Sequence, residues 1–164
     1  MITAPQIDER VAQPYVGIRT QVPMQELGVV IPQFADELFA WLNQQGIAPA
    51  GPPFTRYHVI DMEKELDIEI GIPVAVTASG DGRVSPGVLP AGRYASLVYT
   101  DVSRGIEGNA ALLGWGNAQG LVWDQWPTEK GDAFGGRVEF FLSNPDEEPD
   151  PTIWETEVAI RLAN

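Results

Sequence analysis

The sequence contains no cysteine and only one histidine, His58, among its 164 residues. The lack of cysteine excludes disulfide bonds, thiolate nucleophiles and metal sites built on sulfur. A single histidine also excludes a metal centre assembled from several imidazoles within one chain. We therefore expect neither a metal nor any other cofactor, so that any chemistry has to come from carboxylates, hydroxyls and aromatic rings.

Basic residues are scarce as well, with 10 Lys and Arg against 23 Asp and Glu and a formal net charge of −13. Such a chain repels phosphate and has no basic patch, so we expect no direct binding of nucleic acid. No apolar run approaches the ~18 residues that span a bilayer, and no basic-then-apolar leader is present, so we expect a cytoplasmic protein without a membrane segment. The acidity favours cationic ligands, although most acidic surfaces serve solubility alone.

Two segments show the alternation of a half-buried strand. In TIWETEVAIRL (152–162), every second residue from Trp154 is apolar or threonine, while Glu155, Glu157 and Arg161 share the other parity. A period of two puts these sets on opposite faces of a strand. The segment DIEIGIPV (67–74) has the same alternation and places Glu69 where the later segment has Glu157. The repetition predicts two copies of one acidic strand.

Further matches recur in the same order along the chain. WLNQQGI (41–47) resembles WGNAQGL (115–121), Tyr15 matches Tyr94, and Arg56 matches Arg137. Each half reads as strand, helix, strand, strand and is too small to bury its own sheet face. We predict one α+β domain over 1–164, a tandem β-α-β-β repeat (about 1–76 and 83–164) with one antiparallel sheet. Both helices are expected on one face, with a ligand groove at the junction of the repeats.

By parity, Tyr15, Tyr94, Glu69 and Glu157 are expected to share the face that the helices leave open. Aromatic rings around a carboxylate suit a flat, hydrophobic cation, because the rings supply area and the carboxylate supplies the opposite charge. Tyr57 and Trp154 complete the predicted ligand-binding set. Trp154 either walls the mouth of the pocket or packs against a helix. The competing interpretation is that both glutamates lie on a solvated face. If the protein is an enzyme, Glu157 and Tyr94 are the expected catalytic pair.

A family resemblance rests on FTRYHVID (54–61) followed by DIEIGIPV, and on VLPAGRYASLVYTD (88–101), GWGNAQGL (114–121) and DPTIWETEVAIRL (150–162). Over the whole chain these segments resemble the GyrI-like small-molecule-binding domain, the effector-binding module of many AraC- and MerR-type transcription regulators. The resemblance implies tandem strand–helix–strand–strand units around a central groove that binds hydrophobic, often cationic compounds. It also implies that Glu157 is the key acidic residue and that Tyr94 and Trp154 are pocket aromatics.

The resemblance leaves two other functions open. Some stand-alone members hydrolyse cyclopropane-bearing genotoxins with a glutamate, which implies Glu157 here, and others inhibit DNA gyrase. The sequence has no helix-turn-helix segment, so we expect the stand-alone form. TDVSRGIEG (100–108) replaces the glycine-proline-aromatic turn that family members often have after the tyrosine strand. The fold is shared with haem-binding SOUL-type proteins, but one histidine argues against haem.

Overall fold

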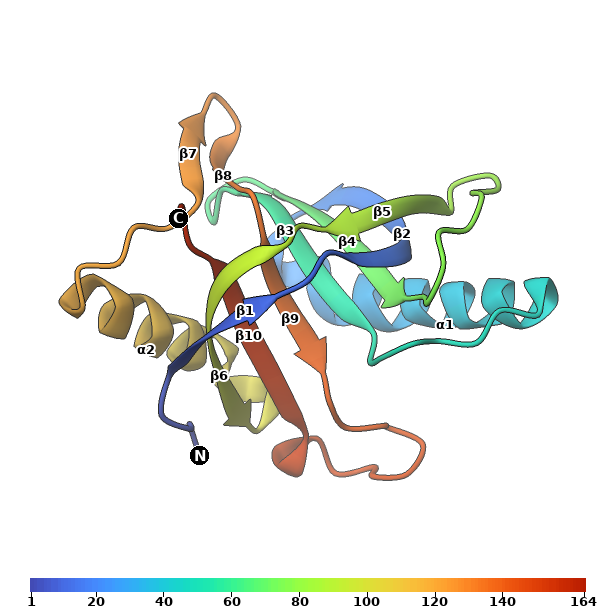
Figure 1. Ribbon diagram of the computed structural model, residues 1–164. Coiled ribbons are helices and arrows are strands. Elements are labelled where there is room, and N and C mark those ends of the chain that lie inside the picture. Colours follow the sequence, from blue (N-terminus) through green and yellow to red (C-terminus); the bar gives the residue numbers. More distant parts are fainter.

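Two helices and a long, curled antiparallel sheet make up the computed structural model, which describes residues 1–164 (Figure 1). The helices are α1 (Leu27–Gln45) and α2 (Gly105–Ala118). The strands are β1 (Gln6–Arg10), β2 (Gln13–Val22), β3 (Phe54–Ile60), β4 (Leu66–Pro73), β5 (Ser85–Leu89), β6 (Gly92–Thr100), β7 (Gln125–Thr128), β8 (Gly131–Phe134), β9 (Arg137–Phe141) and β10 (Glu155–Arg161). Neither helix is sufficiently long and apolar to cross a membrane.

The sheet has the strand order β1-β6-β10-β9-β3-β4-β2-β5, with β8 also pairing with β3 and β7 pairing with β8. The first half of the chain contributes β2, α1, β3 and β4, and the second half contributes β6, α2, β9 and β10. The two halves meet where β3 pairs with β9. The predicted α+β class, with a single antiparallel sheet built from two strand–helix–strand–strand units, is therefore confirmed.

The first strand of each half is exchanged between the halves, which the sequence did not reveal. β1 precedes β2 in the chain but pairs with β6, and β5 precedes β6 but pairs with β2. In Figure 1 these two strands cross in front of the central sheet. Each half thus completes the sheet edge of the other.

The pairing registers test the individual sequence matches. Tyr15 pairs with Pro73 and Tyr94 pairs with Arg161, so the two tyrosines occupy equivalent places. Glu69 pairs with Arg56, whereas Glu157 pairs with Phe140. The equivalent of Arg56 is therefore Phe140, and the match between Arg56 and Arg137 is wrong. The repeat boundaries near residues 76 and 83 stay a prediction.

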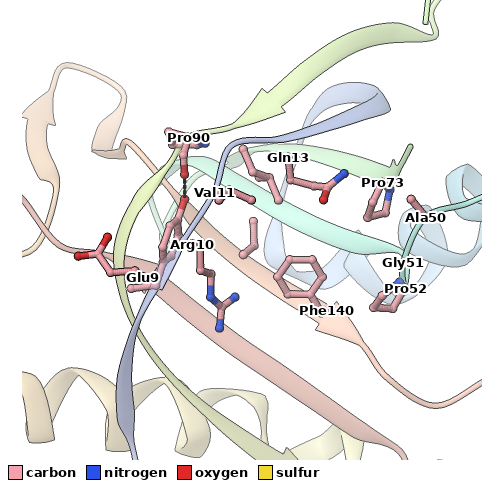
Figure 2. A pocket seen from close by; sticks show the side chains of 13 residues that line it. Glu9, Arg10, Val11, Gln13, Ala50, Gly51, Pro52, Pro73, Pro90 and Phe140 are labelled. Atoms are coloured by element: carbon pink, nitrogen blue, oxygen red, sulfur yellow. Dashed lines mark hydrogen bonds between the residues drawn. The ribbon is translucent and has the colours of Figure 1, made fainter. Parts of the chain in front are cut away.

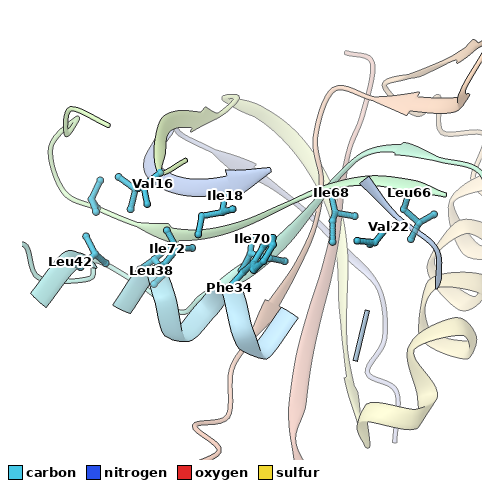
Figure 3. Close-up of a cluster of buried hydrophobic side chains, with 12 residues drawn as sticks. Val16, Ile18, Val22, Phe34, Leu38, Leu42, Leu66, Ile68, Ile70 and Ile72 are labelled. Atoms are coloured by element: carbon cyan, nitrogen blue, oxygen red, sulfur yellow. The ribbon is translucent and has the colours of Figure 1, made fainter. Parts of the chain in front are cut away.

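Helix α1 forms the larger core with β2 and β4. Its buried residues Phe34, Leu38 and Leu42 are four positions apart and so lie on one face of the helix. Figure 3 shows them directed toward the isoleucines of β4, of which Ile70 and Ile72 are fully buried. The helix ends at Gly46, whose φ of 69° is the left-handed conformation that glycine adopts without strain.

Helix α2 packs over β6 and β10 and relies on small residues for close approach. Gly108 lies against the ring of Tyr99, and a methyl group at Gly116 would collide with the ring of Trp123. The Trp123 indole nitrogen donates a hydrogen bond to Asn117 at 3.0 Å. This packing forms a second core under α2, separate from the core under α1. The central strands β3 and β9 lie between the two cores.

Candidate ligand-binding site

The helix-facing side of the sheet has a polar centre. One row of paired residues crosses six adjacent strands in the order Ile18, Ile70, Thr55, Glu139, Val158, Leu97. The outer members belong to the apolar cores under α1 and α2. Thr55 on β3 and Glu139 on β9 are nevertheless buried, with 0% and 9% of their surfaces exposed. Burying a polar group costs free energy unless it is compensated, so this pair requires a physical explanation.

Glu139 is held by hydrogen bonds from two different elements. The side-chain amide of Asn109 on α2 donates to Oε1 at 3.1 Å, and the Tyr57 hydroxyl on β3 donates to Oε2 at 3.3 Å. The hydroxyl of Tyr99 on β6 also reaches this carboxyl group. Burial raises the pKa of Glu139, and the hydrogen bonds and the charge of Arg137 offset this only in part.

The three glutamates of the central strands differ in their charge partners. Glu69 lies 2.9 Å from Nε2 of His58, and Glu157 lies 3.0 Å from Nη1 of Arg10. Glu139 has no nitrogen of a basic side chain within 4.0 Å. It is also the one of the three that lies on the helix-facing side of the sheet, between the apolar cores. A buried carboxylate without a cation is costly in its charged form, and this is the physical cause of its raised pKa.

Two neighbouring polar atoms have no hydrogen-bond partner. The Thr55 hydroxyl, directly opposite Glu139, is buried and unpaired, and so is Nε of Arg137. Another guanidinium nitrogen of Arg137 donates to Oδ1 of Asn109 at 2.9 Å, and the group lies 4.8 Å from the centre of the Phe134 ring. Burial lowers the pKa of Arg137. Buried polar atoms are rarely left unpaired, so the cluster Thr55, Glu139, Asn109, Tyr57 and Arg137 has unused capacity for a polar or charged group.

The opposite face of the sheet carries an open groove of about 460 Å³ (Figure 2). Its floor includes Phe140 and Tyr94, and its rim includes Arg10, the last residue of β1, and Val11 from the segment that joins β1 to β2. Figure 2 shows Pro52 and Pro73 at the other end of the groove, beyond Phe140. This is the groove at the junction of the halves that the sequence predicts, and apolar residues make up nearly half of its lining.

The carboxylate predicted for this groove is already paired. Oε1 of Glu157 accepts a hydrogen bond from Arg10 at 3.0 Å, and the Arg10 guanidinium lies 5.4 Å from the centre of the Tyr94 ring. The Tyr94 hydroxyl donates to the carbonyl oxygen of Pro90 at 2.7 Å. A carboxylate and an aromatic ring therefore come together here, as predicted, but a cation of the chain itself occupies the space between them.

Glu69 belongs to a buried network on the same open face. The hydroxyl of Tyr15 donates to Oε1 of Glu69 at 2.6 Å, and Nη1 of Arg56 donates to that hydroxyl at 3.0 Å. Burial raises the pKa of Tyr15, and the nearby charge of Glu69 raises it further. Both tyrosine and glutamate are almost wholly buried, with 2% and 7% exposed. Glu69 therefore does not line the groove, and its carboxylate is already paired with Tyr15 and His58.

We expect Glu69 to contribute to acid unfolding. Burial disfavours its charge, but hydrogen bonds from His58 and Tyr15 outweigh burial and hold its pKa below the usual 4.5. A carboxylate whose pKa is lower when folded stabilises the fold above its unfolded pKa, and this stabilisation is lost as the pH falls through the folded pKa. The free energy of unfolding in urea should therefore fall less between about pH 6 and about pH 3 for Glu69→Gln than for the native chain.

The control for this measurement is Glu155→Gln, which removes an exposed carboxylate of β10. It should keep the pH dependence of the native chain. Equal pH dependence in the native chain and Glu69→Gln would contradict a stabilising role of the Glu69 charge.

The structure separates the six residues that were predicted to bind a ligand. Tyr15, Tyr94, Glu69 and Glu157 do share the open face, as their parity indicates, although only Tyr94 lines the groove. Tyr57 lies on the helix-facing side, because it pairs with Ile68 of the core under α1, and His58 after it faces the open side, where it contacts Glu69. Trp154 precedes β10, and its indole nitrogen donates to the carbonyl oxygen of Glu148 at 2.6 Å, away from both sites. No three His, Asp or Glu side chains converge to hold a metal ion.

Glu139 and Asn109 are site residues that the sequence patterns did not indicate. A signal was present, because GRVEFFLS places a charged residue at every second position (Arg137 and Glu139) within an otherwise apolar strand. Nothing in the sequence says which face these charges take. Only the pairing of β9 with β3 and β10 directs them toward the helices.

Comparison with solved structures shows the same fold at low sequence identity. The C-terminal domain of EcmrR matches with a TM-score of 0.75 and 16% identity over 98% of both chains. In the complex of EcmrR with DNA, the match has a TM-score of 0.76 and 18% identity, and the present chain spans 57% of the EcmrR chain. A hydrolase from Listeria innocua matches with a TM-score of 0.65 and 13% identity over 97% of this chain and 91% of that one.

A further similar structure is SAV2435 bound to tetraphenylphosphonium, with a TM-score of 0.63 and 9% identity over 99% of this chain and 95% of that one. No curated protein sequence matches the chain. The family model of the GyrI-like small molecule binding domain matches residues 3–163, nearly the whole chain. The resemblance seen in the sequence and the arrangement of the sheet and helices agree with this match, and the chain belongs to the family of GyrI-like small molecule binding domains.

Proposed function

We propose that the chain binds a hydrophobic, positively charged small molecule against the centre of the sheet, between α1 and α2. The observation that carries this proposal is Glu139, a buried carboxylate with no cationic side chain within 4.0 Å. A bound cation supplies the missing charge partner and compensates the cost of burying the carboxylate. The unpaired hydroxyl of Thr55 beside it offers a further polar contact.

The surroundings of Glu139 suit an aromatic or otherwise apolar cation. The hydroxyls of Tyr57 and Tyr99 reach the carboxyl group, so two aromatic rings lie in its immediate surroundings. Ring faces attract cations, and the adjacent cores provide apolar surface. Membership in the GyrI-like family supports small-molecule binding, and the tetraphenylphosphonium complex of SAV2435 shows that this fold can hold a hydrophobic cation. The net charge of −13 supports the proposal that the chain does not itself bind nucleic acid.

Titration with tetraphenylphosphonium, followed by tryptophan fluorescence, tests the proposal, since the chain has five tryptophans. We expect saturable binding, and affinity that rises with pH because the cation competes with a proton on Glu139, whose pKa burial raises. Tetraphenylborate, an anion of the same shape, is the matched control and should bind far more weakly. Equal affinity for the two ions would refute recognition by a carboxylate.

A hydrolase is the second candidate, and the buried position of the Glu139 carboxyl group favours it. Burial raises the pKa of this carboxyl group, and a raised pKa makes a carboxylic acid better suited to donate a proton to a leaving atom as a general acid. The sequence instead predicts Glu157 and Tyr94 for this role. Incubation with a cyclopropane-bearing alkylating compound, followed by mass analysis, should show product with the native chain. Loss of turnover in Glu139→Gln or in Glu157→Gln would identify the acid, and the absence of native turnover would remove this candidate.

A further inference from the structure

The groove on the open face holds an arginine where a ligand cation would be expected. Nη1 of Arg10 donates to Glu157 at 3.0 Å, and its guanidinium lies 5.4 Å from the centre of the Tyr94 ring. Nε of the same side chain donates to Asp8 at 3.2 Å. The guanidinium is therefore bound by two carboxylates and a ring, the combination by which proteins recognise such cations.

We propose that this groove is a binding site for apolar small molecules that carry a guanidinium group, and that Arg10 is an internal occupant which the ligand displaces. The site goes beyond the function proposed above, because Glu157 and Glu139 lie on opposite faces of the sheet. Glu157 pairs with Phe140, and Glu139 is the residue before it on the strand, so the two point in opposite directions.

Space for the apolar body of the ligand lies directly beside the guanidinium. The groove has a volume of about 460 Å³, within the range of small-molecule sites. Phe140, Val138 and Leu89 line it together with Arg10 and Tyr94. A ligand whose guanidinium replaced that of Arg10 would therefore lay its apolar part on Phe140.

Arg10 is attached to an element that can yield. It is the last residue of β1, a five-residue strand at the edge of the sheet that pairs only with β6. Four of the five residues of β1 are exposed, so little apolar surface holds the strand in place. The groups that face the guanidinium are Asp8 on its own strand, Glu157 on β10 and Tyr94 on β6. Withdrawal of Arg10 leaves Glu157 and Tyr94 free for another cation.

Competition between Arg10 and a free ligand sets the expected affinities. A tethered group has an effective concentration of roughly millimolar order, so a free guanidinium binds weakly while Arg10 is present. Arg10→Gln removes this competitor and leaves the carboxylate unpaired. We therefore expect 2-phenylethylguanidine to bind Arg10→Gln at least about tenfold more tightly than the native chain, as measured by isothermal titration calorimetry.

The double variant Arg10→Gln with Glu157→Gln decides whether the carboxylate is responsible, and it should lose this gain. Arg19→Gln is the matched control, because Arg19 makes an exposed ion pair with Asp67 on β4. It should bind like the native chain. No gain in Arg10→Gln, or a gain that persists without the Glu157 charge, would overturn the proposal.

A second variant of Arg10 and a hydrogen-exchange measurement test the displacement of Arg10 independently. If Arg10→Gln does not fold, Arg10→Met retains the apolar stem of the side chain and should show the same gain. In the native chain, saturating ligand should speed hydrogen exchange of the amides of Gln6–Arg10, and unchanged exchange would contradict displacement of Arg10. The affinity for tetraphenylphosphonium, which reports binding at the Glu139 site, should be equal in the native chain and Arg10→Gln. The proposals for the two sites are therefore tested separately.

Discussion

Replacing Glu139 by glutamine should weaken the binding of tetraphenylphosphonium roughly 30-fold, which corresponds to about 2 kcal/mol. Glutamine keeps the shape and can still accept hydrogen bonds from Asn109 and Tyr57. It removes only the negative charge, which has no nitrogen of a basic side chain within 4.0 Å. The dissociation constant, measured by tryptophan fluorescence above neutral pH, is the quantity to compare.

Stability should move in the other direction in the same variant. Burial raises the pKa of Glu139 above its unfolded value, so its charged form lowers stability as the pH rises above the usual 4.5. Glu139→Gln should therefore be at least as stable as the native chain near pH 7, while it binds the cation poorly. Glu155→Gln, at an exposed position of β10, is the control and should alter neither quantity. A destabilised Glu139→Gln with unchanged affinity would show that Glu139 is a structural residue only.

The second large effect is expected from Phe54→Ala, which should lower the free energy of unfolding by about 3–5 kcal/mol. Phe54 is fully buried on β3, where the two halves of the sheet meet. The centre of its ring lies 5.0 Å from that of Tyr15, which it meets edge-on, and 5.4 Å from that of Phe140. The ring also covers Gly71. Truncation would leave a cavity between both halves, which the backbone of the central strands cannot close.

Urea unfolding monitored by circular dichroism measures this loss. Phe39→Ala on α1 is the matched control, because the Phe39 side chain is 41% exposed. The control should change the free energy of unfolding by no more than about 0.5 kcal/mol. A loss below about 1.5 kcal/mol for Phe54→Ala would contradict its place at the centre of the interface between the halves.

Glu157 shows which features of the site strand parity predicts and which it does not. Parity correctly grouped Tyr15, Tyr94, Glu69 and Glu157 on one face, because side chains alternate along any strand. Parity does not reveal the partners of a charge that come from other strands. Arg10 on β1 neutralises Glu157 because β1 is exchanged to the edge of the other half, and no local pattern encodes that exchange. A direct role in ligand binding stays a prediction for each of these four side chains.

Tyr57 and Glu139 show the complementary case. Tyr57 belongs to the set predicted from the sequence, but it follows Arg56, which faces the open side, so alternation along β3 places it beside Glu139 on the helix-facing side. The residues of β3 alone do not say which parity faces the helices, and the pairing of Thr55 and Tyr57 with Ile70 and Ile68 of β4 decides it. Tyr57 was therefore predicted for the groove on the open face, whereas it lies on the helix-facing side.

The sequence by itself determined the α+β class, the two strand–helix–strand–strand units, the acidic character and the family resemblance. Each of these follows from hydrophobic periodicity, composition or the order of short segments, which are local properties of the chain. The tertiary structure alone decided which carboxylate has no cationic partner. That outcome depends on strand order and register, which bring His58 to Glu69 and Arg10 to Glu157 but bring only neutral hydrogen-bond donors within reach of Glu139.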